Sequence, residues 1–263
     1  MNVADIHPTA IVNADAQIGN NVKIGPFTVI DSDVVIGDDS EIGSHAYIAD
    51  GARIGKNCRI HKGAVVATIP QDLKFENEQT FFKIGDNTTV REFCTLNRGT
   101  SESGKSTVGS NCLLMAYAHV AHDCEIGDNV ILANAVQVAG HVTIEDWAII
   151  GGLSGIHQFC HIGRHSMIGG HFRAVHDVPP FIIASEEPLQ FAGVNSVGLR
   201  RRGFSPETRS KIKTAYRLLY RSNLNVSQAV ERIKAEIELV PEIQNILTFI
   251  EESDRGIISA GKR

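Results

Sequence analysis

Aliphatic residues recur at every sixth position over most of this chain, and this period constrains the fold more than any other feature. Of the 28 positions counted in sixes from Ile6 to Ile168, 25 hold Ile, Leu or Val; the exceptions are Asp72, Glu78 and Glu102. A period of six is neither that of a helix nor that of an alternating strand. Three short strands and three corners make an 18-residue coil, and such coils stack through parallel ladders about 4.8 Å apart. The sequence therefore predicts a parallel β-helix solenoid.

Small or β-branched residues form a second column, four residues after each aliphatic. All five cysteines fall in it, which we interpret as packing; they are Cys58, Cys94, Cys112, Cys124 and Cys160. Their odd number and lack of CxxC spacing indicate reduced thiols rather than disulfides or a zinc cage. The chain also shows no signal-peptide pattern and no apolar run of about 18 residues. We therefore expect a cytoplasmic protein without a transmembrane segment.

The six-residue frame is interrupted at residues 67–83 and 97–107 and ends near residue 180. Both interruptions preserve the frame, so we expect loops that leave a coil and return to it. Loops on a rigid scaffold are where function concentrates. The sequence thus predicts a β-helix over residues 1–180, followed by a C-terminal connection and helical domain over residues 181–263.

The C-terminal region shows helical periodicity and a different charge. We expect one helix from Pro206 with Ser205 as its N-cap, a second over residues 226–237, and a third from Pro241. Residues 1–199 carry 12 basic and 22 acidic side chains, whereas the remaining residues carry 13 and 8. The acidic body argues against nucleic-acid binding. The net +5 of the tail would suit a smaller anionic partner.

Six of the 11 histidines lie between His119 and His165. One coil beyond His122 lies Gly140, beside His141, and one coil further lies Gln158, beside His157. We therefore expect His122, His141 and His157 to form a column on one edge of the solenoid, with Asp123 next to the first. A carboxylate beside a histidine can hold one tautomer of the ring, which can then act as a base near neutral pH.

Two other interpretations of these histidines stay open. They could be solvated corner residues, or they could bind zinc, because neutral imidazole is a zinc ligand. His171 and His176 have an HxxxxH spacing that resembles hexapeptide-fold carbonic anhydrases. No matching third histidine is evident, and we predict no metal.

Seven short segments give the chain a family resemblance, and they cover essentially its whole length. In order they are residues 70–74 (PQDLK), 97–100 (NRGT), 119–123 (HVAHD), 139–141 (AGH), 157–160 (HQFC), 177–180 (DVPP) and 198–205 (GLRRRGFS). Together they resemble the UDP-N-acetylglucosamine O-acyltransferases, which catalyse the first step of lipid A synthesis. The [LIV]-G-x-x-x-x repeat also resembles known hexapeptide proteins, and that resemblance implies a left-handed β-helix.

The resemblance implies transfer of an (R)-3-hydroxyacyl group from acyl carrier protein to the 3-position of UDP-N-acetylglucosamine or its 3-amino analogue. His122 matches the general base of the family, and Asp123 matches the residue that orients it. Gly140 matches the backbone N–H that stabilises the oxyanion. No cofactor is implied. Neither the length of the acyl chain nor the choice between hydroxyl and amine follows from the sequence.

The resemblance also implies a homotrimer with clefts between subunits, and a set of binding residues. They are Gln71, Asp72 and Lys74 for the glucosamine; His119, His141, His157 and Gln158 along the cleft; Asn195, Arg201 and Arg202 for the nucleotide; and Gly170 for acyl-chain length. Two positions depart from the family pattern. Val197 replaces a usual glutamate near the nucleotide, and Pro188 replaces a histidine that caps the acyl chain.

Three alternatives resemble the chain less. The N-acyltransferase two steps later in lipid A synthesis carries an extra N-terminal domain, whereas here the repeats begin at Ile6. An acetyl-CoA-dependent hexapeptide acetyltransferase is the second. The third is a non-catalytic β-helix scaffold, which should show regular threonine rows on a flat face instead of loops and clustered histidines.

Overall fold

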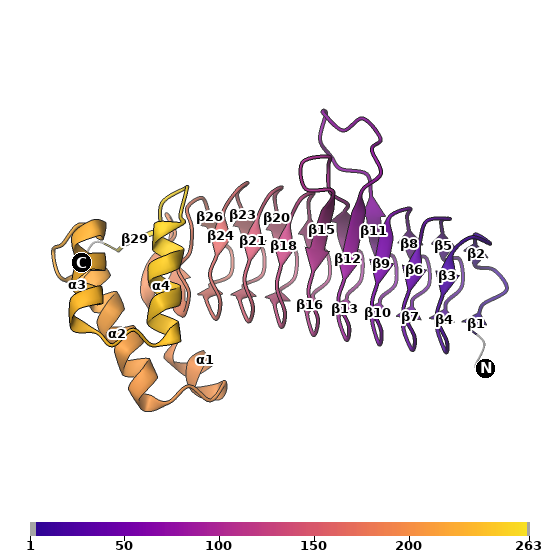
Figure 1. Cartoon of the computed structure of the whole chain (residues 1–263). Helices are drawn as coiled ribbons and strands as arrows, with labels where there is room; N and C mark the ends of the chain where they lie inside the picture. The colour runs from indigo at the N-terminus through magenta and orange to yellow at the C-terminus, as the bar shows by residue number, and fades with distance from the viewer. Residues whose placement is uncertain (1–3, 262–263) are drawn as a thin grey trace.

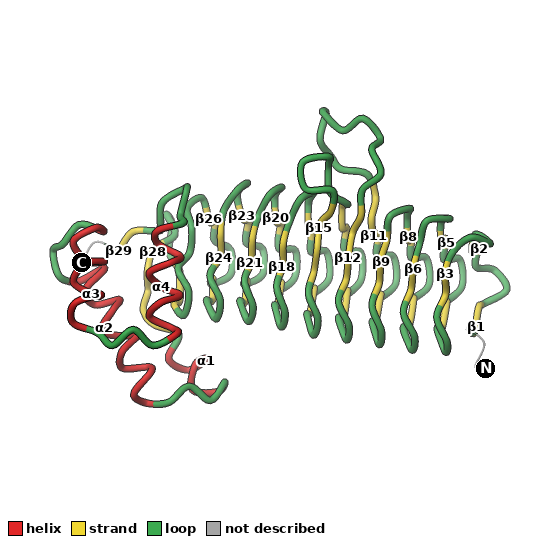
Figure 2. The backbone as a smooth tube through the Cα atoms, viewed as in Figure 1, coloured by secondary structure: helices red, strands yellow, loops and turns green. Residues whose placement is uncertain are grey.

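The computed structural model describes residues 4–261, which form the predicted left-handed parallel β-helix with helices at its C-terminal end (Figure 1). Each coil gives one short strand to each of three sheets, the sides of a long prism (Figure 2). Sheet A contains β1 (Asp5–Ile6), β4 (Lys23–Ile24), β7 (Glu41–Ile42), β10 (Arg59–Ile60), β13 (Thr89–Val90), β16 (Leu113–Leu114), β19 (Ile131–Leu132), β22 (Ile149–Ile150), β25 (Met167–Ile168), β27 (Ile182–Ser185), β28 (Gln190–Val194) and β29 (Ser259–Ala260). Sheet B contains β2 (Ile11–Val12), β5 (Val29–Ile30), β8 (Tyr47–Ile48), β11 (Val65–Thr68), β14 (Thr95–Asn97), β17 (His119–Val120), β20 (Gln137–Val138), β23 (Gly155–Ile156) and β26 (Arg173–Ala174). Sheet C contains β3 (Gln17–Ile18), β6 (Val35–Ile36), β9 (Ala52–Ile54), β12 (Phe81–Ile84), β15 (Lys105–Val108), β18 (Glu125–Ile126), β21 (Thr143–Ile144) and β24 (His161–Ile162).

The sixth-position aliphatics fill the interior of the prism. Leu96, Val120 and Val138, for example, are fully buried and pair in parallel register from one coil to the next. Each such side chain contributes roughly 1.5–3 kcal/mol when buried, and only a neighbouring coil can bury it. The five cysteines are free and buried in the same interior, as expected of packing residues.

Two loops leave the prism at a single edge, where sheet B turns into sheet C; we call it the B–C edge (Figure 1). They comprise residues 69–80, between β11 and β12, and residues 98–104, between β14 and β15. Both are shorter than predicted, because β12 and β15 begin before the aliphatic frame resumes, and the earlier residue Phe82 is already fully buried. Paired residues in neighbouring coils lie 18 residues apart over most of the prism, but 30 and 24 residues apart across these two loops. The extra lengths are multiples of six, so the frame is preserved.

Four helices follow the prism: α1 (Ser196–Arg201), α2 (Pro206–Arg221), α3 (Val226–Glu236) and α4 (Pro241–Glu251). The Ser205 side chain caps α2 as predicted by accepting from the N–H of Thr208, whereas the short helix α1 was not predicted. Strands β27, β28 and β29 extend sheet A beyond β25: β27 pairs with β25 in parallel, and β28 pairs with β27 antiparallel. The hydroxyl of Tyr216 donates to the Pro180 carbonyl at 2.5 Å, which fastens α2 to the end of the prism. Across residues 4–261, none of the helices has the length and apolar character needed to span a bilayer.

Candidate active site

The B–C edge holds two columns of side chains that repeat from coil to coil. Strands β17, β20 and β23 each end in an inward-facing aliphatic residue and are followed by a turn. One column consists of the second residue after each aliphatic, and the other consists of the third. Residues at the third position have a positive φ of 57° to 61°. The second-position column is His122, Gly140 and Gln158, and the third-position column is Asp123, His141 and Phe159.

His122 and Asp123 form a buried pair. His122 Nδ1 lies 2.9 Å from Asp123 Oδ2, and the Asp123 side chain is fully buried. The N–H and hydroxyl of Thr100 donate to Asp123 at 2.9 and 2.8 Å, and the Ser103 hydroxyl donates to Asp123 Oδ1. Burial raises the pKa of Asp123, but hydrogen bonds from Ser103, His122 and Thr100 outweigh it and lower the pKa to about 2. An ionised carboxylate only accepts, so His122 carries its proton on Nδ1 and leaves Nε2 free to accept one.

Gly140 lies directly against the ring of His122. A Cβ atom at this position would lie 2.6 Å from His122 Cε1 and 2.8 Å from Nε2, so only glycine allows the ring its present position. The Gly140 N–H makes no hydrogen bond to any residue that the structure describes. A proton acceptor and a free backbone donor therefore adjoin each other on this edge, as acyl transfer through an oxyanion requires.

His141 contacts His122, but His157 does not continue the column. The rings of His122 and His141 meet edge to face with centroids 5.0 Å apart, and His141 stacks on Phe159 at 4.6 Å. The predicted column of three histidines is therefore wrong at its third member. His157 comes only 16 residues after His141, so it occupies the column of Ala139, and Phe159 takes the expected place. Glu102, on the second loop, brings a carboxylate oxygen within 3.8 Å of His141 Nε2.

His157 instead lines a groove on sheet B, together with His119. The groove has a volume of about 350 Å³. Gly155 has no side chain, so it leaves space between the side chains of Gln137 and Arg173, its partners in the two neighbouring coils. His119 Nδ1 lies 2.8 Å from the Thr95 hydroxyl, and burial lowers the pKa of His119. Ala139 lines this groove and precedes Gly140, so the groove lies next to the column of His122, Gly140 and Gln158.

The first loop carries Gln71, Asp72 and Lys74. Gln71 and Lys74 are exposed, and Asp72 accepts from the N–H of Lys74 at 3.0 Å within a local turn. Among residues 4–261, the hydrogen bonds of these side chains do not reach His122 or Asp123. Within one chain, the hydrogen bonds of the described residues therefore do not link the predicted glucosamine-binding residues to His122.

The predicted nucleotide-binding residues lie at a different edge, where sheet C turns into sheet A; we call it the C–A edge. The Asn195 side chain caps α1 and donates to the His165 carbonyl at 2.9 Å. The Arg202 guanidinium lies over the ring of Trp147, 5.0 Å from its centroid, and 3.4 Å from His165 Nδ1. Burial, Arg202 and Arg164 lower the pKa of His165 to about 4, so the ring is neutral beside the arginine.

The other predicted residues are also remote from His122. Arg201 and Val197 are exposed on α1. Gly170 lies on the third edge, between sheets A and B, where a Cβ atom would come within 3.2 Å of the Gly152 carbonyl oxygen. The predicted residues thus occupy all three edges of the prism.

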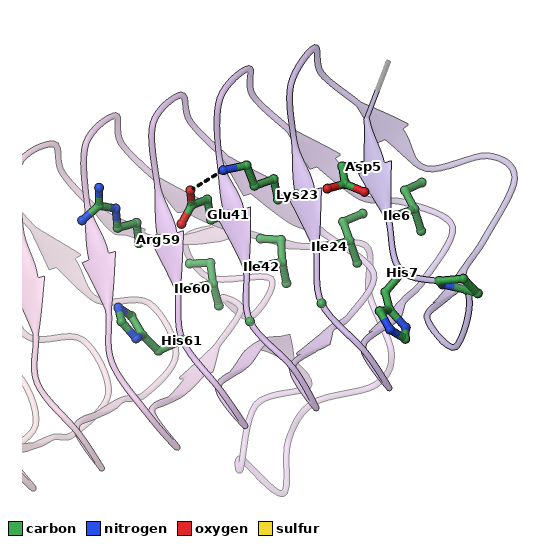
Figure 3. A pocket seen from close by; sticks show the side chains of 13 residues that line it. Asp5, Ile6, His7, Lys23, Ile24, Glu41, Ile42, Arg59, Ile60 and His61 are labelled. Carbon is green, nitrogen blue, oxygen red and sulfur yellow. Dashed lines mark hydrogen bonds and ion pairs between the residues drawn. The ribbon is translucent and has the colours of Figure 1, made fainter. Parts of the chain in front are cut away.

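A larger groove of about 560 Å³ lies on the N-terminal coils of sheet A (Figure 3). Gly25 and Gly43 form its floor, between His7 and His61. The charges along it alternate from coil to coil, and those of Lys23 and Glu41 pair at 3.2 Å; the column is Asp5, Lys23, Glu41 and Arg59. It contains none of the residues predicted to act on a substrate.

Sequence reasoning missed the side chains that support the His122–Asp123 pair. Thr100 and Ser103 support Asp123, and Glu102 approaches His141. One signal was present: the second loop leaves β14, the strand that pairs with β17, so it begins directly beside the His122 turn. The six-residue period therefore places the start of the second loop next to His122. It does not determine which side chains of the loop point toward Asp123, because that depends on the conformation of the loop.

Comparisons with known proteins identify the family of the chain. Residues 177–258 match the family described as UDP-N-acetylglucosamine O-acyltransferase, domain 2, and residues 33–68 and 105–140 match the bacterial transferase hexapeptide repeat. An acyl-[acyl-carrier-protein]–UDP-N-acetylglucosamine O-acyltransferase of Thiobacillus denitrificans is 48% identical over 97% of this chain and 100% of its own length. The enzyme of the same name from Burkholderia lata is 50% identical, over 96% of this chain and 98% of its own.

Solved structures show the same likeness. The UDP-N-acetylglucosamine acyltransferase of Bacteroides fragilis is 48% identical and superposes with a TM-score of 0.94, covering 96% of this chain and 99% of that one. The structure from Acinetobacter baumannii is 44% identical, with a TM-score of 0.93 and the same coverage. Such identity over nearly the whole length, together with a shared fold, confirms the resemblance seen in the sequence. The chain belongs to the UDP-N-acetylglucosamine O-acyltransferase family.

Proposed function

We propose that this enzyme transfers an (R)-3-hydroxyacyl group from acyl carrier protein to the 3-position of UDP-N-acetylglucosamine, the first step of lipid A synthesis. The observation that carries the mechanism is the His122–Asp123 pair lying against the free N–H of Gly140. Full-length relatives named for this reaction support the substrates. Five buried free thiols suit a reducing cytoplasm, where this donor would be available.

The chemistry needs no covalent enzyme intermediate. His122 Nε2 takes the proton of the sugar 3-hydroxyl as its oxygen attacks the thioester carbonyl carbon. The Gly140 N–H donates to the oxyanion that forms on the carbonyl oxygen. When the tetrahedral intermediate collapses, the carbon–sulfur bond breaks, and the imidazolium returns the proton to the leaving thiolate. Asp123 stabilises the imidazolium between these two transfers.

The site is completed by a second and third copy of the chain. One chain separates the base, the nucleotide-binding residues and Gly170 on three edges, but neighbouring prisms in a homotrimer can bring different edges together. Sheet A supplies a suitable contact surface, because its outward column in the central coils is apolar; these residues are Leu113, Ile131, Ile149 and Met167. Light scattering under assay conditions should give a trimeric mass. A monomeric mass in an active sample would reject this arrangement.

Helix α2 offers the docking surface for the donor. Four basic residues recur every fourth position along it, and across residues 4–261 their side chains form no ion pairs; they are Arg209, Lys213, Arg217 and Arg221. Three of them line a groove of about 490 Å³ whose apolar side includes Phe191 and Val194. Acyl carrier proteins are acidic, so this stripe would speed their association. Acyl-carrier-protein donors should outperform the coenzyme A thioesters, and more so at low salt; equal use of both would reject the proposal.

The acceptor is tested by assaying UDP-N-acetylglucosamine and its 3-amino analogue with a panel of hydroxyacyl donors. We expect transfer to the 3-hydroxyl, because the hydroxyl is the group for which a general base is needed. Turnover of the amino analogue alone would make the chain an N-acyltransferase at the same position. Failure of both acceptors with every donor would reject the proposed function.

A further inference from the structure

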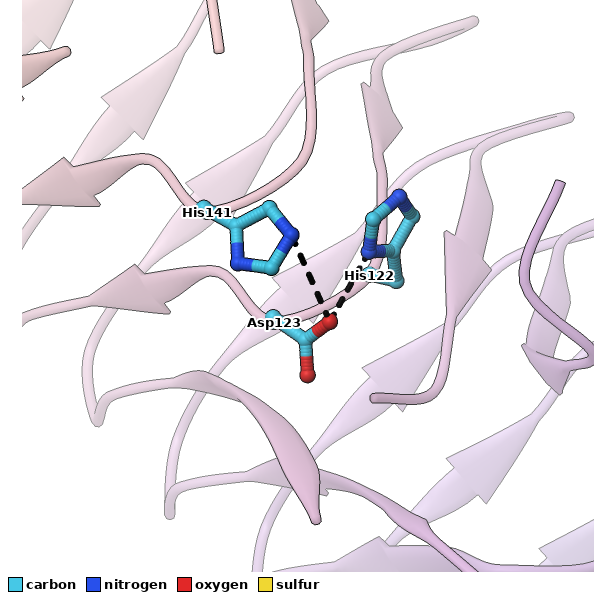
Figure 4. A group of neighbouring side chains, drawn as sticks. All are labelled: His122, Asp123 and His141. Atoms are coloured by element: carbon cyan, nitrogen blue, oxygen red, sulfur yellow. Dashed lines mark hydrogen bonds and ion pairs between the residues drawn. The ribbon is translucent and has the colours of Figure 1, made fainter. Parts of the chain in front are cut away.

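The catalytic turn gathers more potential metal ligands than a general base requires. One nitrogen from His122, one from His141 and a carboxylate oxygen of Asp123 all lie within 4.8 Å of one another. Figure 4 shows both rings directed toward the same carboxylate oxygen, Asp123 Oδ2, at 2.9 Å from His122 Nδ1 and 3.8 Å from His141 Nε2. Two imidazoles and a carboxylate are a ligand set typical of zinc.

The spacing of these atoms fits such an ion after small side-chain adjustments. Zinc–nitrogen and zinc–oxygen bonds of about 2.0–2.2 Å in a tetrahedron place ligand atoms roughly 3.3 Å apart. The ring of His141 is held in its direction by stacking on Phe159, and Asp123 is fixed by Thr100. Such outer contacts orient ligands and raise affinity. Glu102, exposed and 3.8 Å from His141 Nε2, can close the tetrahedron.

We propose that His122, Asp123 and His141, with Glu102, bind one Zn²⁺ ion per chain, and that this ion inhibits acyl transfer. The inhibition follows from the tautomer of His122. Figure 4 shows that Nδ1 is the nitrogen facing the cluster, so the ion would replace the proton on Nδ1. A neutral imidazole bound through Nδ1 carries its proton on Nε2, which can then no longer accept one from the acceptor hydroxyl. This half of the proposal rests on the proposed role of His122 as base.

Metal binding is measured first, without substrates, on the full-length protein. Co²⁺ serves as a spectroscopic probe, because a tetrahedral site gives it strong visible absorption, and Zn²⁺ alone is then used to displace it. The informative variant is His141→Phe, which keeps a ring to stack on Phe159 and removes one ligand; Phe159 itself shows that this corner accepts phenylalanine. The matched control is His45→Asn, at an exposed corner of the N-terminal coils.

We expect one tetrahedral ion per chain in the wild type and in His45→Asn, and at least about tenfold weaker binding in His141→Phe. Binding should also weaken as pH falls, because protons compete for the ligands. Equal binding by the wild type and His141→Phe, or none by either, would overturn the site.

Inhibition is measured separately, on metal-free enzyme titrated with Zn²⁺. Wild-type turnover should fall with the same midpoint as binding and return when a chelator is added. Saturable binding without loss of turnover would overturn the inhibitory half of the proposal. A metal-free enzyme that transfers no acyl group would contradict the proposed function instead, and the absorption measurement would still decide the metal site.

Discussion

Replacing Thr100 by Val tests how the second loop holds the Asp123 carboxylate beside His122, the proposed base. Valine keeps the shape of the side chain and the N–H that donates to Asp123 Oδ1 at 2.9 Å, but it removes the hydroxyl that donates to Oδ2 at 2.8 Å. A hydrogen bond to a charged group contributes about 1.5–3 kcal/mol. The hydroxyl of Ser103 and the ring of His122 still hold the carboxylate in the variant, so the cost should be at or below the lower end of this range.

The pKa of Asp123 gives an independent figure and a pH dependence. Its fall from 3.8 to about 2, despite the opposing effect of burial, corresponds to roughly 2–3 kcal/mol shared among all the donors. We therefore expect Thr100→Val to lose about 1 kcal/mol of folding free energy at pH 7. Because the folded-state pKa is the lower one, this stabilisation is present above about pH 4 and is lost as pH falls through about 2. The difference between wild type and variant should shrink over that interval.

The same variant should slow the reaction moderately. If the loosened carboxylate costs about 1 kcal/mol in the transition state, kcat falls roughly fivefold, with KM nearly unchanged. Denaturant unfolding at fixed protein concentration and steady-state kinetics measure the two effects. Ser101→Ala, an exposed neighbour in the same loop, is the control and should behave as wild type. A variant as stable and as fast as wild type would refute the support we assign to Thr100.

Three further substitutions test other parts of the site. Gly140→Ala would place a methyl group 2.6 Å from His122 Cε1; displacing the ring should lower kcat by about 10² or more without unfolding the protein, and unchanged kinetics would contradict the contact. Gly170→Met should shorten the acyl chain preferred in a donor panel, whereas an unchanged preference would remove Gly170 as a determinant of chain length. Arg217→Glu should raise KM for the acyl-carrier-protein donor and weaken its salt dependence, while turnover of a coenzyme A thioester stays constant. Equal effects on both donors would contradict a docking role.

The fold could be predicted because every coil repeats the same six-residue pattern of aliphatic residues in the sequence. The frame aliphatics are the inward residues of the strands, and loops whose extra lengths are multiples of six could not shift the frame. The same 18-residue coil placed Gly140 against His122 and brought His141 beside both. The pairing of His122 with Asp123 followed from their adjacency in one turn.

Other parts of the site were not predicted from the six-residue period of the sequence. His157 was misplaced although the period was sufficient, because Phe159, not His157, lies 18 residues after His141 and stacks on it. The inward turn of Thr100 is set by the conformation of the second loop. Asn195 and Arg202 follow the repeats, so their place at the C–A edge came only from the structure.

The most direct test of the mechanism is single-turnover transfer by His122→Ala and His122→Gln, in the presence of a chelator. Glutamine can still donate to Asp123, so it preserves the buried hydrogen bond while removing the proton acceptor. With an acyl-carrier-protein donor and UDP-N-acetylglucosamine, both variants should lose at least about 10²-fold in rate. Circular dichroism and thermal unfolding of His122→Gln should match the wild type. A folded His122→Gln enzyme that transfers the acyl group at nearly the wild-type rate would contradict His122 as the general base.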